Sequence, residues 1–157
     1  MKQDRFLMGI LVGIGALVVL ALVVFFVRGD TQSYGSEATP EGVVHNYVLA
    51  VLNKDYEKAY GYLADLDHKP TYEDFRRAFL NGEVNPESAG VDIGASQITG
   101  DVATVDLELV YNSSDPFSPG YRNPYKADLV RQNGAWKLTL MPQYNLWGYN
   151  WYVESPK

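Results

Sequence analysis

The sequence predicts an α+β protein: an N-terminal transmembrane helix, then about three helices packed on an antiparallel sheet of four or more strands. Three observations predict this class. Residues 6–27 form a run of twenty-two residues without a charge. Apolar residues then recur at helical spacing in three segments before residue 82, and at a spacing of two in four segments after residue 89. Helices that precede strands, rather than alternate with them, are typical of α+β domains.

The uncharged run at residues 6–27 is long enough to cross a membrane. A helix rises about 1.5 Å per residue, so this one would cover roughly 33 Å, against a hydrocarbon core of about 30 Å. It is longer than the apolar core of a signal peptide, and no small-residue cleavage site follows it directly, which favours a retained anchor over a cleaved signal. Lys2 and Arg5 favour a cytoplasmic N-terminus. We therefore expect a single-pass protein of the cytoplasmic (inner) membrane, with residues 1–5 inside and the C-terminal domain outside the cytoplasm.

Within this run, Gly9 and Gly13 form a GxxxG motif. Small residues at this spacing let two helix backbones approach closely. Glycine is also common in membrane helices without such a role. We take these two residues as candidates for helix packing in the membrane, with a second copy or with another protein.

Composition narrows the classes of partner. The chain has thirteen Lys/Arg and nineteen acidic residues, of which three Lys/Arg and two acids lie in the first 30 residues. Residues 31–157 therefore hold ten Lys/Arg and seventeen acids, a net charge of −7. An acidic domain without a basic stripe argues against nucleic acid as a partner. The chain has no cysteine, so thiol catalysis and cysteine-bound zinc are excluded.

Residues 28–38 are small and polar without periodicity, and we expect them to form a tether. Capping residues then predict three helices. Thr39 followed by Pro40 opens the first, Asp55 opens the second and Thr71 opens the third. The four segments with a spacing of two are predicted strands, at 90–98, 102–111, 125–132 and 135–141.

The turn Asn133-Gly134 is a strong hairpin signal between the last two predicted strands. A long loop is expected at 112–124. The helices are expected to pack on one face of the sheet.

This order resembles the nuclear transport factor two-like (cystatin-like cone) superfamily, which includes ketosteroid-isomerase-like and SnoaL-like domains. The resemblance rests on the helix pair at 40–65 and on the hairpins at 97–111 and 125–138, the last containing Gly134-Ala135-Trp136-Lys137. The resemblance covers residues 39–143. Within the superfamily, the chain is similar in layout in particular to small membrane-anchored bacterial members of uncharacterised role. The resemblance implies a strongly curved sheet that folds around the helices. Because this fold serves enzymes, carriers and inert modules alike, the resemblance does not select a function.

Enzymes of this superfamily hold a carboxylate base and a hydrogen-bond donor inside the cone. Asp106 and Glu108 alternate against an apolar set and are expected to point away from the core. His45 and His68 have no second ligand or orienting acid at a useful spacing. We therefore assign no catalytic, cofactor-binding or metal-binding residue.

Two aromatic sets remain as candidates. Tyr47, Tyr56 and Tyr60 lie on the predicted helices, either in the core with their hydroxyls at its rim or lining a pocket for a small ligand. In the tail, residues 144–157, alternating aromatic residues would form an edge strand or wrap that closes the core. The alternatives are a docking surface for a protein partner, an interfacial membrane contact, and stacking on a sugar. The loop at 112–124 would form the second part of such a docking surface. The candidate contact residues are Trp147, Tyr149 and Trp151 of the tail and Phe117 and Tyr121 of the loop.

The sequence thus favours a membrane-anchored, non-enzymatic interaction module or accessory subunit, binding a protein or a second copy of itself. The alternative is a small-molecule carrier or a ketosteroid-isomerase-like enzyme with a tyrosine-lined pocket. That alternative requires a cavity and an inward carboxylate.

Overall fold

A computed structural model describes residues 5–27, 32–111, 120–142, 146–148 and 151–152, with the α1 side chains described from residue 8 to residue 24. The chain divides into two compact units, Met1–Ser33 and Tyr34–Lys157. The first contains the helix α1, and the second contains the strands and the other helices that the structure describes.

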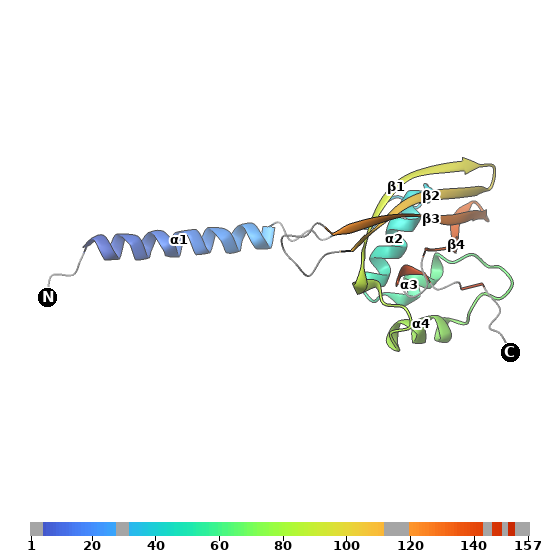
Figure 1. The fold of residues 1–157 in the computed structure, drawn as a ribbon, viewed down its shortest axis with the longest axis horizontal. Helices are drawn as coiled ribbons and strands as arrows, with labels where there is room; N and C mark the ends of the chain where they lie inside the picture. Colours follow the sequence, from blue (N-terminus) through green and yellow to red (C-terminus); the bar gives the residue numbers. More distant parts are fainter. Residues whose placement is uncertain (1–4, 28–31, 112–119, 143–145, 149–150, 153–157) are drawn as a thin grey trace. The chain divides into compact units, whose positions relative to one another are not determined.

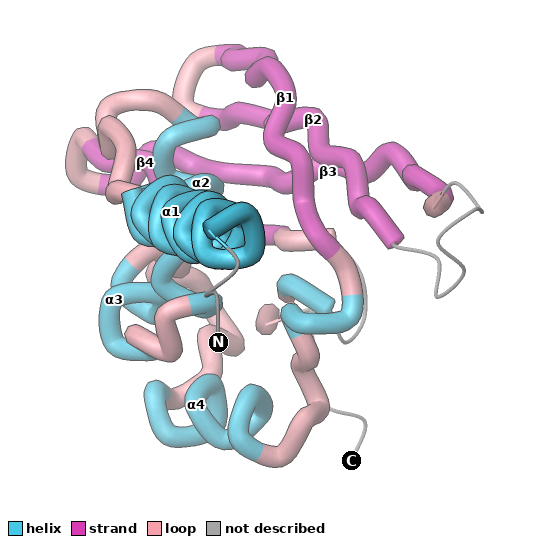
Figure 2. Tube along the Cα trace, turned by 90° about the vertical axis from the view of Figure 1, so that its left-hand side faces the viewer, coloured by secondary structure: helices cyan, strands magenta, loops and turns pink. Residues whose placement is uncertain are grey.

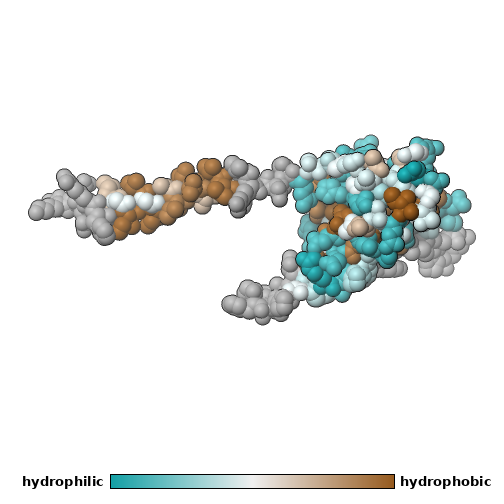
Figure 3. All heavy atoms as spheres, turned by 90° about the horizontal axis from the view of Figure 1, so that it is seen from above, coloured by the Kyte–Doolittle hydropathy of each residue, from teal (hydrophilic) through white to brown (hydrophobic). Residues whose placement is uncertain are grey.

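The first unit corrects the expected localisation. Helix α1 runs over Arg5–Val27, and its exposed side chains at residues 8–24 are apolar (Figure 3). Over the residues that the structure describes, however, no helix combines the length and the apolar character needed to cross a membrane. The expectation of a single-pass inner-membrane protein with its domain outside the cytoplasm is therefore wrong on this finding.

The second unit opens with three helices at the positions that the capping residues predict. They are α2 (Pro40–Leu52), α3 (Tyr56–Gly61) and α4 (Tyr72–Leu80). Thr39, Asp55 and Thr71 each accept a hydrogen bond from a backbone N–H in the first turn of the helix that follows. A short 3-10 turn, η1 (Pro86–Ser88), leads into the sheet.

Four antiparallel strands form one sheet in the order β1-β2-β3-β4, which confirms the α+β class (Figures 1 and 2). Their bounds are β1 (Gly90–Thr99), β2 (Val102–Tyr111), β3 (Tyr121–Gln132) and β4 (Ala135–Leu140). Asn133 and Gly134 both have positive φ, 53° and 82°, as the predicted two-residue hairpin requires.

Strand β3 begins earlier than the sequence predicts, at Tyr121 rather than at residue 125. We expected residues 121–124 to belong to the long loop at 112–124. Proline cannot donate to a strand ladder, so a proline within a strand needs a position where its missing N–H is not used. In the structure Pro124 pairs with Glu108 of β2, whereas β4 pairs with β3 only from Asp128 onward. The proline therefore lies where β3 is an edge strand, and its missing N–H costs no ladder hydrogen bond.

The core lies between the sheet and the helices. Helices α2, α3 and α4 lie on the same side of the sheet in both views (Figures 1 and 2). The inward residues of β2 alternate along the strand as predicted and are buried: Ala103, Val105, Leu107 and Leu109. They meet a buried face of α2 that includes Val44, Tyr47 and Val51.

The segment before α2 belongs to the second unit. The side chain of Asn46, fully buried in α2, holds Gly35 at two points: its Oδ1 accepts from the Gly35 N–H at 2.7 Å and its Nδ2 donates to the Gly35 carbonyl at 3.1 Å. The Tyr62 hydroxyl donates to Glu37 at 2.7 Å. Part of the sequence that we expected to be a tether, residues 28–38, is thus fixed to the domain from Tyr34 onward.

Candidate functional site on the outer sheet face

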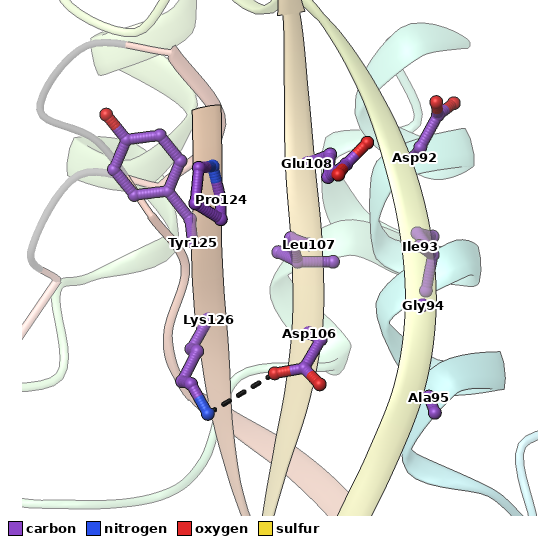
Figure 4. A pocket seen from close by; sticks show the side chains of 10 residues that line it. All are labelled: Asp92, Ile93, Gly94, Ala95, Asp106, Leu107, Glu108, Pro124, Tyr125 and Lys126. Atoms are coloured by element: carbon purple, nitrogen blue, oxygen red, sulfur yellow. Dashed lines mark ion pairs between the residues drawn. The ribbon is translucent and has the colours of Figure 1, made fainter. Parts of the chain in front are cut away.

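The sheet face that points away from the helices carries charged side chains from three strands. The pairing of the strands sets these side chains in rows across the sheet. Asp92 pairs with Glu108, which pairs with Pro124, and in the next outward-facing row Asp106 pairs with Lys126. A hollow of about 760 Å³ opens here (Figure 4). The residues between these positions, Ile93, Leu107 and Tyr125, instead pack on or in the core of the domain.

Ion pairs cross the strands of this face. Arg122 of β3 contacts both Asp92 of β1 and Glu108 of β2, the second at 3.0 Å. These two carboxylates raise the pKa of the Arg122 guanidinium, Asp92 more strongly. Lys126 pairs with Asp106 at 3.3 Å (Figure 4). All five side chains are at least half exposed, so the pairs add little to stability and chiefly set the charge pattern of the surface.

A bulge in β1 shapes the hollow. The register between β1 and β2 shifts between Ile93 and Ser96, which leaves Gly94 and Ala95 without partners in the ladder. A Cβ added to Gly94 would lie 3.1 Å from the Asp106 carbonyl oxygen. Glycine therefore lets β1 approach β2 closely at the point where the strand bends.

Three of these outer-face residues were not among the sequence candidates. Arg122 fell in the expected loop, so its ion pairs with Asp92 and Glu108 could not be predicted. Asp92 and Lys126 are ordinary charged strand residues, and only the pairing register shows that they share one surface. The predicted outward direction of Asp106 and Glu108 is confirmed.

The three candidate tyrosines lie at or next to the core. Tyr47 is fully buried, and burial raises the pKa of its hydroxyl, an effect that the neighbouring Trp151 indole opposes. Tyr60 is half-buried and its hydroxyl donates to the Pro70 carbonyl at 2.8 Å. Tyr56 stacks on Phe79, with ring centroids 5.1 Å apart. Aromatic side chains thus fill the space beside these residues.

An inward carboxylate would be needed for the enzymatic alternative. Among the residues that the structure describes, Asn46 is the one buried polar or charged side chain, and it holds Gly35. The described ranges also contain no group of three or more His, Cys, Asp or Glu side chains able to hold a metal ion.

The described part of the tail lies in the core. Trp147 is 1% exposed and its indole Nε1 donates to the Ala89 carbonyl at 3.2 Å, next to the start of β1. Trp151 is 7% exposed and packs against Phe75 with ring centroids 4.6 Å apart. The structure therefore places these two tryptophans where they close the core, the first role considered for the tail, and not on an exposed docking surface.

The remaining sequence candidates fall in different places. Tyr121 is 59% exposed and stacks on Tyr111, with centroids 4.6 Å apart. Gly9 and Gly13 lie on α1, where an added Cβ would meet no atom within 4 Å. Phe117 and Tyr149 lie outside the described residues.

Comparison with known proteins yields distant structural likenesses only. No family model and no curated protein matches the sequence. Among solved structures, the chain is similar to a SEC-C motif containing protein from Rhodopseudomonas palustris, with 15% identity, 66% of this chain and 77% of that chain covered, and a TM-score of 0.45. It is also similar to an uncharacterized cystatin fold protein from Novosphingobium aromaticivorans, with 12% identity, 66% and 95% coverage, and a TM-score of 0.40. At these scores neither likeness indicates a function.

Proposed function

We propose that the Tyr34–Lys157 unit is a non-enzymatic interaction module or accessory subunit that binds a protein partner through the outer face of its sheet. The observation that carries this proposal is the hollow of about 760 Å³ across β1, β2 and β3, bordered by exposed charged side chains. Protein interfaces commonly combine a less polar centre with a charged, solvent-accessible rim. A paired sheet backed by a packed core also holds such a surface rigid.

The inner side of the domain supports this proposal over the carrier or ketosteroid-isomerase-like alternative. That chemistry uses a buried acid whose pKa is shifted by an apolar site. The described core contains apolar and aromatic side chains and the one amide of Asn46. No specific contact in the described residues favours the alternative.

We also propose that the domain is a distant member of the nuclear transport factor two-like superfamily. The order of three helices before a four-stranded antiparallel sheet supports this placement. So does the closing hairpin, in which Trp136 is buried and Arg131 lies over its ring at 4.4 Å.

Site-specific photo-crosslinking in the native host tests the interaction. A photoreactive amino acid replaces Pro124, which lines the hollow and is exposed, in the full-length chain. The matched position is Glu73, exposed on α4. We expect a discrete crosslinked protein from position 124 and none from position 73, and a lower yield from position 124 when Lys126→Glu is added. Equal crosslinking from both positions, or none from position 124, would contradict the proposal.

A further inference from the structure

The two edges of the sheet differ. At the β4 edge, the chain after α3 covers the strand: Leu63 forms a parallel bridge with Leu138, Ala64 N–H donates to the Leu138 carbonyl at 2.9 Å, and Leu138 N–H donates to the Tyr62 carbonyl at 2.8 Å. At the opposite edge lies β1, and no strand of the described residues pairs with its outer side. An uncovered edge is a template for an additional strand.

The hydrogen-bond alternation shows which β1 groups face outward. Arg131 N–H donates to the Asp101 carbonyl at 2.7 Å, so odd-numbered residues of β2 bond to β3 and even-numbered ones bond to β1. Asp92, opposite an even-numbered residue, therefore bonds to β2. Its neighbours Val91 and Ile93 point their N–H and C=O groups to the open edge, which offers about four main-chain hydrogen bonds.

An acidic side chain blocks the same edge further along. Beyond the bulge, Ser96 lies opposite Val105, and its N–H donates to a Glu41 carboxylate oxygen at 3.0 Å. This bond agrees with the alternation, because Ser96 is then also an outward-facing residue. Among the described residues, the strand edge is thus capped at Ser96 and unpaired at Val91 and Ile93.

The side chains beside the open edge define what could pair there. Asp92 points to the outer face, is 60% exposed, and shares the single Arg122 guanidinium with Glu108. The group of Asp92, Glu108 and Arg122 therefore has a net charge of −1. Val91 and Ile93 point to the other face and are half-buried against the core.

We propose that the β1 edge at residues 90–93 takes an extended segment of a partner protein as a fifth strand, with a basic residue beside Asp92 and apolar residues on either side of it. The inference rests on the proposed function and specifies the partner's chemistry. Main-chain bonds would provide the attachment and the alternating side chains the selectivity. A second copy of this chain fits poorly, because antiparallel pairing through Val91 and Ile93 places Asp92 opposite the Asp92 of the copy, and like charges in directly opposed positions are destabilising.

A peptide titration tests this edge. The full-length protein, kept in a mild detergent because α1 exposes apolar side chains, is titrated with a capped Val-Lys-Val-Lys-Val peptide and followed by backbone amide NMR. We expect shifts and slower hydrogen exchange at Val91 and Ile93. Two peptides serve as controls: the Glu version, which should bind more weakly, and a version methylated on its backbone nitrogens, which should not bind. Equal binding of all three peptides would overturn the inference.

A charge swap separates the edge from general electrostatic attraction. Asp92→Lys should weaken the lysine peptide about threefold to tenfold and strengthen the glutamate peptide by a similar factor. Asp67→Lys makes the same change in net charge in an exposed loop and should alter neither. If Asp92→Lys fails to fold, Asp92→Asn replaces it, with a smaller weakening expected.

The outcomes distinguish the two proposals. Peptide shifts confined to residues around Lys126, with Val91 and Ile93 unchanged, would refute the edge while crosslinking from position 124 still supported the interaction module. Loss of that crosslinking as well would refute the module itself.

Discussion

Truncation of one buried tryptophan tests whether the tail is part of the fold. Trp147→Ala removes an indole that is 1% exposed and whose Nε1 bonds to the Ala89 carbonyl. A buried Trp side chain removes roughly 150–250 Å² from water, which at about 25 cal/mol per Å² corresponds to about 4–6 kcal/mol. Trp→Ala changes in cores typically cost about 3–5 kcal/mol, and domains are stable by only about 5–15 kcal/mol. We expect a loss of about 4 kcal/mol.

Urea unfolding of the full-length protein, followed by far-UV circular dichroism, measures this loss. With a urea dependence of about 2 kcal/mol per molar, the midpoint should fall by about 2 M. Trp147→Phe should retain much of the apolar contact and lose the hydrogen bond, for an intermediate effect. Leu80→Ala, at a side chain 59% exposed on α4, is the control and should change the free energy by less than about 1 kcal/mol. A loss below about 1 kcal/mol for Trp147→Ala would refute the packing of the tail and restore its interpretation as a docking surface.

Two further predictions concern the start of α2. Gly42→Ala would place a Cβ 1.8 Å from the Ser36 carbonyl oxygen and displace the segment around Ser36, so it should destabilise the domain by roughly 2–4 kcal/mol. Gly61→Ala is the control and should be neutral, because the added Cβ would meet no atom within 4 Å. Urea unfolding midpoints of the two variants measure the difference. The hydrogen bond from Ser96 lowers the pKa of Glu41 below its ordinary 4.5, so its stabilising contribution is present above pH 4.5 and is lost as the pH falls through the folded-state pKa. Thermal melts between pH 3 and pH 7 should therefore show a smaller acid-side loss for Glu41→Gln than for the unchanged chain, and identical profiles would contradict the assignment.

The sequence alone determined the elements whose signals are local. The caps Thr39, Asp55 and Thr71 satisfy the first N–H groups of their helices wherever those helices pack. Residues Asn133 and Gly134 form the turn because a two-residue hairpin turn needs positive φ at both positions, and asparagine and glycine adopt positive φ more readily than other residues. Strict alternation in β2 separates a buried face from a polar one, so the α+β class and the outward direction of Asp106 and Glu108 could be predicted.

Only the tertiary structure decided features that depend on residues distant in the chain. Pro124 is compatible with β3 because β4 is too short to pair with it. The length of β4 cannot be predicted from the residues around Pro124. Alternating aromatic residues in the tail would share a side in an extended segment, but whether Trp151 meets solvent or Phe75 depends on the helices. Which sheet edge stays open depends on where residues 62–64 return to β4. Local preferences act over a few residues, whereas burial, edges and charge networks arise from contacts across the whole domain.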